Sequence, residues 1–296
     1  MSWTGGITAS SASGTTQTLT PDVTDRHKYT IASFTVPKTG IYKFELYGSG
    51  GEIAYARNVA GNGYEQRATG GSGGYTSYSL DLQPSTVIHF ACGGAGSCSF
   101  ISSSAPTNTS NALTTVLPVN VYAVAGGGGT GGTTHDKNNL TGYNCIRGIG
   151  GNGGGESGTA GEDGREAKGG AAGTATTGYA YGKGDIDSGW GAEGNYYGAG
   201  GYAGEGWYGG RAGGGSAYKD GARAGGGGGG SGYIQNKSLG TMTTGGGATE
   251  GKLGSIRITY QGPAQLPVVF NGTAVTKINF NGTDVTHVVF NGTQIY

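Results

Sequence analysis

Residues 126–232 constrain the fold more than any other part of the chain, because 43 of these 107 residues are glycine. The stretch contains no proline, valine or phenylalanine. Its branched aliphatic residues are Leu140, Ile146, Ile149 and Ile186. Such a segment cannot build an apolar core, and each glycine would destabilise an α-helix by roughly 1 kcal/mol relative to alanine. Three states fit this composition: a disordered linker, collagen, or extended polyglycine helices packed backbone to backbone.

Two of these states are disfavoured by the spacing and by the aromatic content. Collagen needs glycine at every third position and abundant proline. Here the glycine spacing drifts, and no proline lies between Pro118 and Pro263. The stretch also carries eight tyrosines and two tryptophans, whereas disordered chains are poor in aromatic residues. We therefore expect a bundle of extended helices.

An extended helix with three residues per turn makes no internal hydrogen bonds, so its N–H and C=O groups point sideways. Without side chains, neighbouring helices can approach closely enough to pair these groups with each other. Ordering glycine carries a large entropic cost. The rest of the chain must therefore supply a scaffold that offsets this cost.

The flanking sequence predicts such a scaffold, because short β-branched and aromatic runs separated by turn residues are typical of an antiparallel β-sandwich. The predicted strands are residues 29–36, 41–47, 75–82, 87–92, 114–124 and 255–260. Helical periodicity is absent, so an all-β fold is expected. The last strand follows the glycine-rich stretch, and we therefore expect residues 126–249 to be inserted between sandwich strands at 29–125 and 250–262. Residues 1–28 are polar and are predicted to form an arm or attachment segment.

The C-terminal residues 263–296 form a separate unit with three ten-residue repeats, each centred on Phe-Asn-Gly-Thr. Asn-Gly between β-branched and aromatic residues is a strong signal for a β-hairpin with a two-residue turn. Such a turn pairs Phe270 with Thr273 and Val268 with Val275, and the later repeats copy this pairing. One hairpin is marginal alone. The three are expected to stack on each other, on the sandwich, or across a homo-oligomer axis.

Several function classes are disfavoured by charge and by motif content. Eighteen basic and eighteen acidic residues give no net charge, so no electrostatic footprint for a nucleic-acid partner is visible. The N-terminal residues lack the pattern of a signal peptide and no stretch is long enough to span a membrane. We therefore expect a protein made in a cytosol, without membrane insertion, and we discount N-glycosylation at the Asn-Gly-Thr triplets.

Catalysis is not expected, since the glycine-rich motif matches lack the structural context that their chemistry requires. The four histidines lie far apart in the sequence. Asp185 and Asp187 are too few ligands for a calcium site, which needs six or more oxygens, so a solvated turn is expected. The cysteines Cys92, Cys98 and Cys145 match no common zinc spacing and are expected to be buried or idle thiols. We predict neither a cofactor nor a metal.

Binding is the more plausible activity, because six aromatic residues fall within nineteen positions. They are Trp190, Tyr196, Tyr197, Tyr202, Trp207 and Tyr208. Rigid aromatic rings among glycine and small residues are typical of recognition loops. With the nearby charges of Glu193, Glu205, Arg211 and Lys219, such rings could hold a sugar or a protein loop. The alternative is that they wall a glycine bundle that has no side-chain core.

Several of these features, taken in order, resemble a known family. The features are FTVPKTGIY at 34–42, ELYGSGG at 45–51, AVAGGGG at 123–129, the glycine run 225–232 and the closing strand 256–260. This order resembles the glycine-rich domain shared by anaplastic lymphoma kinase-type receptors and many phage and bacterial proteins, over residues 30–262. The resemblance implies a TNF-like, jelly-roll β-sandwich that carries a polyglycine-II bundle. Such a bundle also resembles the distal adhesin of some T-even-like phage tail fibres, whose loops contact the host surface.

The C-terminal Asn-Gly repeats are similar to the ends of tail proteins of phages that infect Gram-positive bacteria. Together these features predict a phage tail fibre or tail tip protein that is assembled in the host cytoplasm. Its expected partners are a host cell-surface glycan or protein and other virion tail proteins. The resemblance to fibres and sandwich trimers implies a homotrimer.

The alternative is a purely structural virion component, such as a head fibre, a decoration protein or a fibre connector. An extracellular matrix protein is disfavoured by the missing signal peptide. An enzymatic depolymerase lacks a paired-carboxylate signature.

Overall fold

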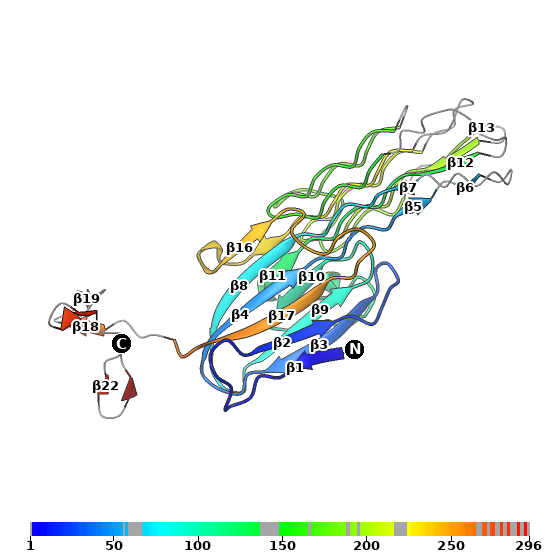
Figure 1. Cartoon of the computed structure of the whole chain (residues 1–296). Helices are drawn as coiled ribbons and strands as arrows, with labels where there is room; N and C mark the ends of the chain where they lie inside the picture. The colour runs from blue at the N-terminus through cyan, green and yellow to red at the C-terminus, as the bar shows by residue number, and fades with distance from the viewer. Residues whose placement is uncertain are drawn as a thin grey trace.

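The computed structural model describes residues 2–55, 57–58, 67–136, 148–164, 167–187, 190–193, 196–215 and 224–264, and paired strand residues between 268 and 294. Two antiparallel sheets of six and five strands form a β-sandwich (Figure 1). Within the described ranges there is no α-helix. Three short 3-10 helices occur instead: η1 (Ala112–Thr115), η2 (Pro118–Asn120) and η3 (Lys237–Leu239). The predicted all-β sandwich is confirmed.

The six-stranded sheet brings the N-terminal strands β1 (Ser2–Gly5) and β2 (Thr16–Thr20) beside the late strand β17 (Ser255–Gly262). Its order is β1, β2, β17, β4 (Gly40–Tyr47), β8 (Tyr75–Leu82) and β16 (Gly240–Thr243). The late strand β17 pairs with β4 and β2, with Ile256 opposite Leu46 and Leu19. The glycine-rich stretch is therefore inserted between strands of the sandwich. Strands β1 and β2, from the segment expected to be an arm, both pair within this sheet.

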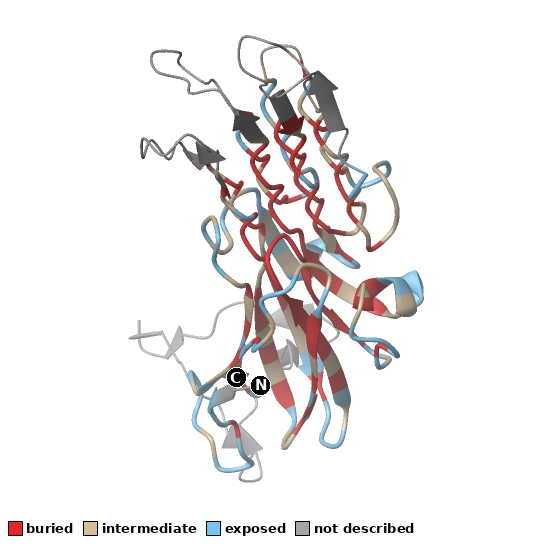
Figure 2. Ribbon diagram, turned by 90° about the vertical axis from the view of Figure 1, so that its right-hand side faces the viewer, coloured by how far each residue is buried: buried red, intermediate tan, exposed pale blue. Residues whose placement is uncertain are grey.

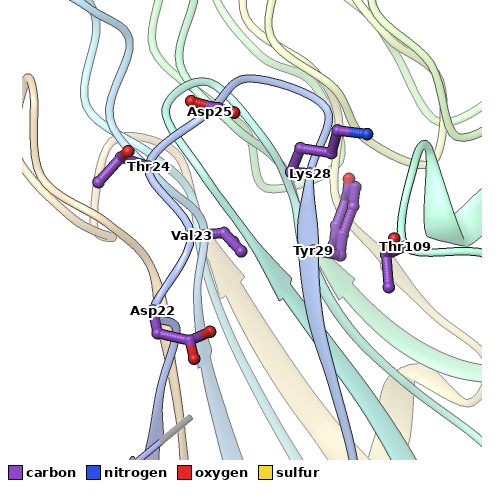
Figure 3. A pocket seen from close by; sticks show the side chains of 7 residues that line it. All are labelled: Asp22, Val23, Thr24, Asp25, Lys28, Tyr29 and Thr109. Carbon is purple, nitrogen blue, oxygen red and sulfur yellow. The ribbon is translucent and has the colours of Figure 1, made fainter.

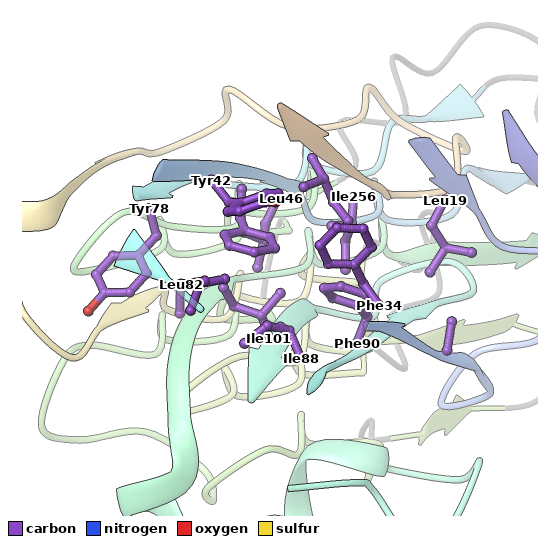
Figure 4. Packing of buried hydrophobic residues seen from close by; sticks show 14 of the residues in the cluster. Leu19, Phe34, Tyr42, Leu46, Tyr78, Leu82, Ile88, Phe90, Ile101 and Ile256 are labelled. Carbon is purple, nitrogen blue, oxygen red and sulfur yellow. The ribbon is translucent and has the colours of Figure 1, made fainter. Parts of the chain in front are cut away.

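The five-stranded sheet forms the other layer. Its order is β15 (Tyr233–Ile234), β11 (Val121–Ala125), β10 (Ser99–Ser102), β9 (Val87–Gly93) and β3 (Tyr29–Thr35). The core lies between the layers (Figure 4). There, Phe44 of β4 meets Phe90 of β9 with ring centroids 6.2 Å apart. Strand β17 alternates as its sequence predicts, with Ile256 and Ile258 buried and Arg257 exposed.

Five of the six predicted strands are confirmed, and the sixth is wrong over most of its length. Residues 114–124 hold the end of η1 and all of η2 before strand β11 begins at Val121. Pro118 has no N–H to donate to a sheet, and it occupies the first turn of η2, where that loss costs little. Asn111, which caps η1, has a left-handed backbone with φ of 48°. This local turn chemistry overrides the β-branched composition of the segment.

The glycine-rich insertion consists of extended segments joined side by side by main-chain hydrogen bonds. The N–H groups of residues 225–230 donate in rotation to three neighbouring segments, 211–214, 159–162 and 127–130. Their carbonyl groups accept in rotation from three others, 201–204, 170–173 and 151–154. The nitrogen–oxygen distances are 2.7 to 3.0 Å, which is normal hydrogen-bond geometry. Partners recur at every third residue, the period of an extended helix with three residues per turn.

Close approach of the main chains explains why these positions are glycine. A Cβ on Gly229 would lie 1.9 Å from the carbonyl oxygen of Asn152, and one on Gly51 would lie 1.9 Å from that of Gly129. Most glycines of these segments are buried (Figure 2). We refer below to the described residues 48–54, 68–74, 126–132, 148–187 and 199–232 as the glycine bundle.

Four segments of the glycine bundle are directly continuous in sequence with strands of the sandwich. Residues 48–54 follow β4, residues 126–132 follow β11, residues 68–74 lead into β8, and residues 224–232 lead into β15. Each of these four bundle segments is thus held at one end by a strand of the sandwich. In this way the sandwich clamps the bundle and fixes which segments lie side by side.

Short strands extend the glycine bundle at the end away from the sandwich (Figure 1). One sheet has the order β13 (Trp190–Glu193), β14 (Tyr196–Ala199), β12 (Thr133–Asp136) and β6 (Arg57–Asn58). A second pairs β5 (Ala54–Tyr55) with β7 (Arg67–Ala68).

The predicted register of the C-terminal hairpins is confirmed. Val268 pairs with Val275 and Phe270 with Thr273, between β18 (Val268–Phe270) and β19 (Thr273–Val275). The same Phe–Thr pairing recurs between β20 (Asn279–Phe280) and β21 (Thr283–Asp284), and between β22 (Val289–Phe290) and β23 (Thr293–Gln294). The Asn-Gly turns lie outside the described residues, and the stacking of the hairpins stays a prediction.

None of the helices formed by the described residues has the length and apolar character needed to cross a membrane.

Candidate functional site

Three of the six predicted site residues belong to one hairpin at the far end of the glycine bundle. Strands β13 and β14 pair so that Trp190 lies opposite Ala199, and Tyr197 and Tyr196 lie opposite Ala192 and Glu193. Strand β14 also pairs with β12, which places His135 opposite Tyr197. The backbone therefore brings Trp190, Tyr196 and Tyr197 together, while their side chains lie outside the description.

An extended segment follows strand β14 and runs back toward the sandwich. Trp207 lies at the sandwich end of this segment and packs against the sandwich. Its ring stacks on Tyr233 of β15 with centroids 3.7 Å apart and planes 8° apart, and it meets the Tyr181 ring edge-on at 5.1 Å. All three rings adjoin a second buried cluster that contains Phe100 and Leu113. Trp207 thus packs at the junction between the glycine bundle and the sandwich. The backbone N–H of the next residue, Tyr208, donates to Ser231 Oγ at 3.0 Å.

The chain between these two groups spans the length of the bundle. Trp207 lies eight residue steps after Ala199, and at about 3.1 Å per step these cover about 25 Å. The six aromatic residues therefore form a distal group and a proximal group, with Tyr202 between them. They do not line a single site.

Tyr202 is the predicted site residue whose described side chain faces solvent, and it is 38% exposed. The guanidinium carbon of Arg26 lies 4.9 Å from the centre of its ring. Arg26 Nη2 in turn donates to Glu52 Oε2 at 3.1 Å. The backbone of Tyr202 is fixed by Thr130, whose N–H donates to the Tyr202 carbonyl at 2.8 Å and whose Oγ1 accepts from the Tyr202 N–H at 2.6 Å.

A pocket of about 210 Å³ lies beside Tyr202, on the flank of the glycine bundle. Its polar lining includes Glu52, Thr130 and Thr133, and its apolar lining includes Ile53 and Ala54. Three bundle segments contribute to it, the ends that lead into β5 and β12 and the start of the segment that follows β14. We call it the Tyr202 pocket.

A wider pocket of about 430 Å³ lies on the sandwich and is lined by Asp22, Val23, Thr24, Asp25, Lys28, Tyr29 and Thr109 (Figure 3). Its charged groups have both signs. Lys28 Nζ donates to Ser110 Oγ at 2.8 Å, and the Tyr29 hydroxyl is buried and donates to Glu205. Tyr29 is the aromatic residue that lines this pocket and it is buried, so the pocket lacks the exposed ring that the Tyr202 pocket has.

Glu205 is fully buried, so it cannot hold a ligand alongside the aromatic rings. Its carboxylate contacts the His27 imidazole and accepts from the Tyr29 hydroxyl, which lies 3.2 Å from Cys98 Sγ. Burial raises the pKa of the Tyr29 hydroxyl well above its usual value, and burial also raises the pKa of the Cys98 thiol. Glu205 thus joins the bundle to the sandwich.

Sequence reasoning missed this role of Glu205, although its position in a glycine-rich stretch held a signal. A carboxylate in a segment that must be buried needs a partner. Of the other charges expected near the rings, Arg211 lies 5.2 Å from the centre of the Tyr179 ring. Glu193 and Lys219 have side chains outside the description.

The described residues offer no group of three His, Cys, Asp or Glu side chains arranged to bind a metal. Asp185 Oδ1 accepts from the N–H of Asp187 at 3.1 Å, which is a turn contact. Cys92 and Cys98 are buried free thiols, as expected. Burial raises the pKa of Cys92 to about 12, so this thiol is neutral at physiological pH. Cys145 lies outside the described residues.

No protein-family model and no curated protein sequence matches this chain.

Proposed function

We propose that this protein is a phage tail fibre or tail tip protein that binds the surface of the host cell. One observation carries the proposal. Four segments of the glycine bundle continue directly from strands of the sandwich, and the far end of the bundle carries the β13–β14 hairpin with Trp190, Tyr196 and Tyr197. A receptor-binding tip needs to present its loops at a distance from its attachment point, on a support that does not bend.

The main-chain pairing supports this stiffness. Each N–H and each C=O of residues 225–230 has a hydrogen-bond partner, and the partners come from six different segments. Bending the bundle would therefore break many hydrogen bonds among buried groups, and each buried group left unpaired costs about 1 to 3 kcal/mol. On this reading the insertion is a polyglycine-II bundle and the support is a TNF-like jelly roll.

Cell binding tests the proposal directly. The purified full chain would be labelled and incubated with a panel of intact bacterial strains, with a second protein in which residues 190–197 are replaced by a Gly-Ser segment of equal length. We expect the native chain to bind cells of at least one strain and the replaced chain to lose that binding. A chain that lacks residues 263–296 is the control and should still bind. Failure to bind any strain, or binding that survives the replacement, would contradict the proposal.

A second candidate function is a purely structural virion component, and the C-terminal repeats favour it. The same Phe–Thr pairing recurs in three successive hairpins, as expected of a repeated docking surface for other virion proteins. Labelled electron micrographs of the particle separate the candidates, because an adhesin lies at the distal tail whereas a decoration or connector protein lies on the capsid or mid-tail. A homotrimer would have three times the 29.4 kDa chain mass in light scattering.

A further inference from the structure

The Tyr202 pocket combines features that suit one class of ligand. Tyr202 is an exposed ring on a bundle built mostly of glycine, and its main chain is hydrogen-bonded to Thr130 in both directions. Arg26, whose side chain is only 12% exposed, lies over the ring. Because the ring is already held in place, little conformational entropy is lost when a ligand stacks on it.

The second feature is a hydrogen-bond acceptor beside the ring. The Glu52 side chain is 51% exposed, and Arg26 engages its Oε2 atom. A carboxylate has two oxygens with about four acceptor positions in total. Within the described residues, Glu52 therefore keeps acceptor capacity for hydroxyl groups of a ligand.

Charge and size restrict the ligand further. The ion pair with Arg26 neutralises Glu52, so the pocket attracts neither anions nor cations strongly. Its volume of about 210 Å³ is below the roughly 300 to 1,000 Å³ of sites for drug-sized molecules. The pocket therefore fits about one ring of a larger molecule.

We propose that the Tyr202 pocket binds one neutral pyranose unit of a cell-surface glycan. The C–H face of the sugar stacks on Tyr202, and its hydroxyl groups donate to Glu52. This inference rests on the proposed host-binding function and names its ligand class. It adds a second contact on the flank of the bundle, which supports the main contact made by the distal hairpin.

Sugar titrations test the inference without the cell. The ¹⁵N-labelled full chain would be titrated with methyl glycosides of glucose, galactose, mannose, rhamnose, N-acetylglucosamine and N-acetylgalactosamine. Amide shifts of Gly131, Gly200 and Tyr202 report on the pocket. We expect at least one neutral glycoside to bind with shifts centred on these amides, and glucuronic acid to bind at least about fivefold more weakly than that glycoside.

Variants connect the binding to the pocket. Tyr202→Ala should weaken the affinity about tenfold or more, whereas Tyr202→Phe should keep it within about twofold, because the aromatic face is retained. Glu52→Gln should weaken it about fivefold. The matched control is Tyr179→Ala, because Tyr179 also lies under an arginine in the bundle but does not line the pocket. Thermal unfolding of each variant shows whether it is folded.

Every outcome decides the inference. No binding of any neutral glycoside, binding with shifts elsewhere in the chain, or equal losses in Tyr202→Ala and Tyr179→Ala would overturn it. If Tyr202→Ala does not fold, Tyr202→Phe and Glu52→Gln decide it by the same criteria. Cell binding that persists in a chain without sugar binding would overturn the pocket assignment and leave the host-binding function standing. Sugar binding without cell binding would support the pocket and contradict that function.

Discussion

The sandwich and the glycine bundle are stabilised in opposite ways within one chain. In the sandwich, rings such as Phe44 and Phe90 fill the space between the two sheets. In the bundle, residues 225–230 have no side chains, and the main chains themselves are in contact on all sides. Apolar burial stabilises the first region, whereas lateral hydrogen bonds and close main-chain contacts stabilise the second.

The two regions are therefore sensitive to opposite kinds of substitution. A side-chain core is sensitive to atoms that are removed, since a cavity forms. A main-chain core is sensitive to atoms that are added, since a single Cβ separates two segments that are hydrogen-bonded to each other. The bundle also lacks an apolar core of its own, so its order depends on the strands that hold four of its segments. We expect the two regions to respond differently to the same kind of change.

The largest expected effect is a truncation in the sandwich core. Phe90 is fully buried and meets Phe44 across the two sheets. Phe90→Ala should reduce the free energy of unfolding by about 3 to 5 kcal/mol, because it removes transfer energy and leaves a cavity. Chemical denaturation measures this loss. Since the bundle depends on the sandwich, bundle amides should lose protection from hydrogen exchange together with the sandwich amides. Bundle amides that stay protected after the sandwich has unfolded would show that the bundle is stable alone.

The reverse substitution belongs in the bundle. Gly229→Ala would place a Cβ 1.9 Å from the carbonyl oxygen of Asn152, so the two main chains must separate. We expect a loss of about 3 kcal/mol, at the upper end of the range for overpacked cores. The loss should appear as faster hydrogen exchange of bundle amides, while the sandwich amides stay protected.

Gly214→Ala is the matched control in the same bundle. A Cβ there would lie 3.5 Å from its nearest neighbours, the backbone nitrogen and oxygen of Lys168, which is ordinary contact. Its expected effect is close to zero. Equal effects at Gly214 and Gly229 would show that the bundle is too loose for main-chain contact to stabilise it.

The same contrast explains what could be predicted from the sequence. Strands such as β17 can be predicted from the alternation of apolar and polar residues, because one face is buried and the other is solvated. Strand β10 was missed because all four of its residues are buried, two serines included, so no alternation exists. Strand β2 was missed because its polar composition is typical of a linker, although Leu19 is fully buried.

The composition predicts that extended glycine-rich segments pack side by side, but it does not predict which segments are neighbours. One glycine resembles every other, so no residue pattern tells which segment lies beside which. The stacking of Trp207 on Tyr233 and the contact of Glu205 with Tyr29 depend on these relations. The Tyr202 pocket depends on them too, since it brings together three segments that are far apart in the sequence.

A third substitution tests the junction between the two regions. Glu205→Ala removes the buried carboxylate and leaves the Tyr29 hydroxyl and the His27 imidazole without their partner. We expect a loss of about 2 to 3 kcal/mol, because buried polar groups that lose a charged partner pay a desolvation cost. Glu156→Ala is the control, as its ion pair with Lys237 is exposed and should contribute about 1 kcal/mol or less. A loss no larger than that of Glu156→Ala would mean that the junction does not depend on this carboxylate.

The smallest expected effect is a pH dependence that originates in the sandwich. Burial tends to raise the pKa of Glu45, but hydrogen bonds from Arg257, Tyr75 and Lys43 outweigh it and lower that pKa below its usual value. A carboxyl group with a lowered pKa in the folded state stabilises the protein above its unfolded pKa, and this contribution is lost as the pH falls through the folded value. The bundle core at residues 225–230 has no titratable side chain and therefore adds no pH dependence of its own.

We therefore expect Glu45→Gln to be less stable than the native chain by about 1 kcal/mol at pH 7, with the difference disappearing toward pH 3. Thermal unfolding of both proteins over this pH range measures it. Because the bundle depends on the sandwich, bundle amides that exchange through global unfolding should show the same difference between the two proteins. A stability difference that persists unchanged at pH 3 would show that Glu45 acts through packing. Its ion pairs with Arg257 and Lys43 would then not stabilise the sandwich.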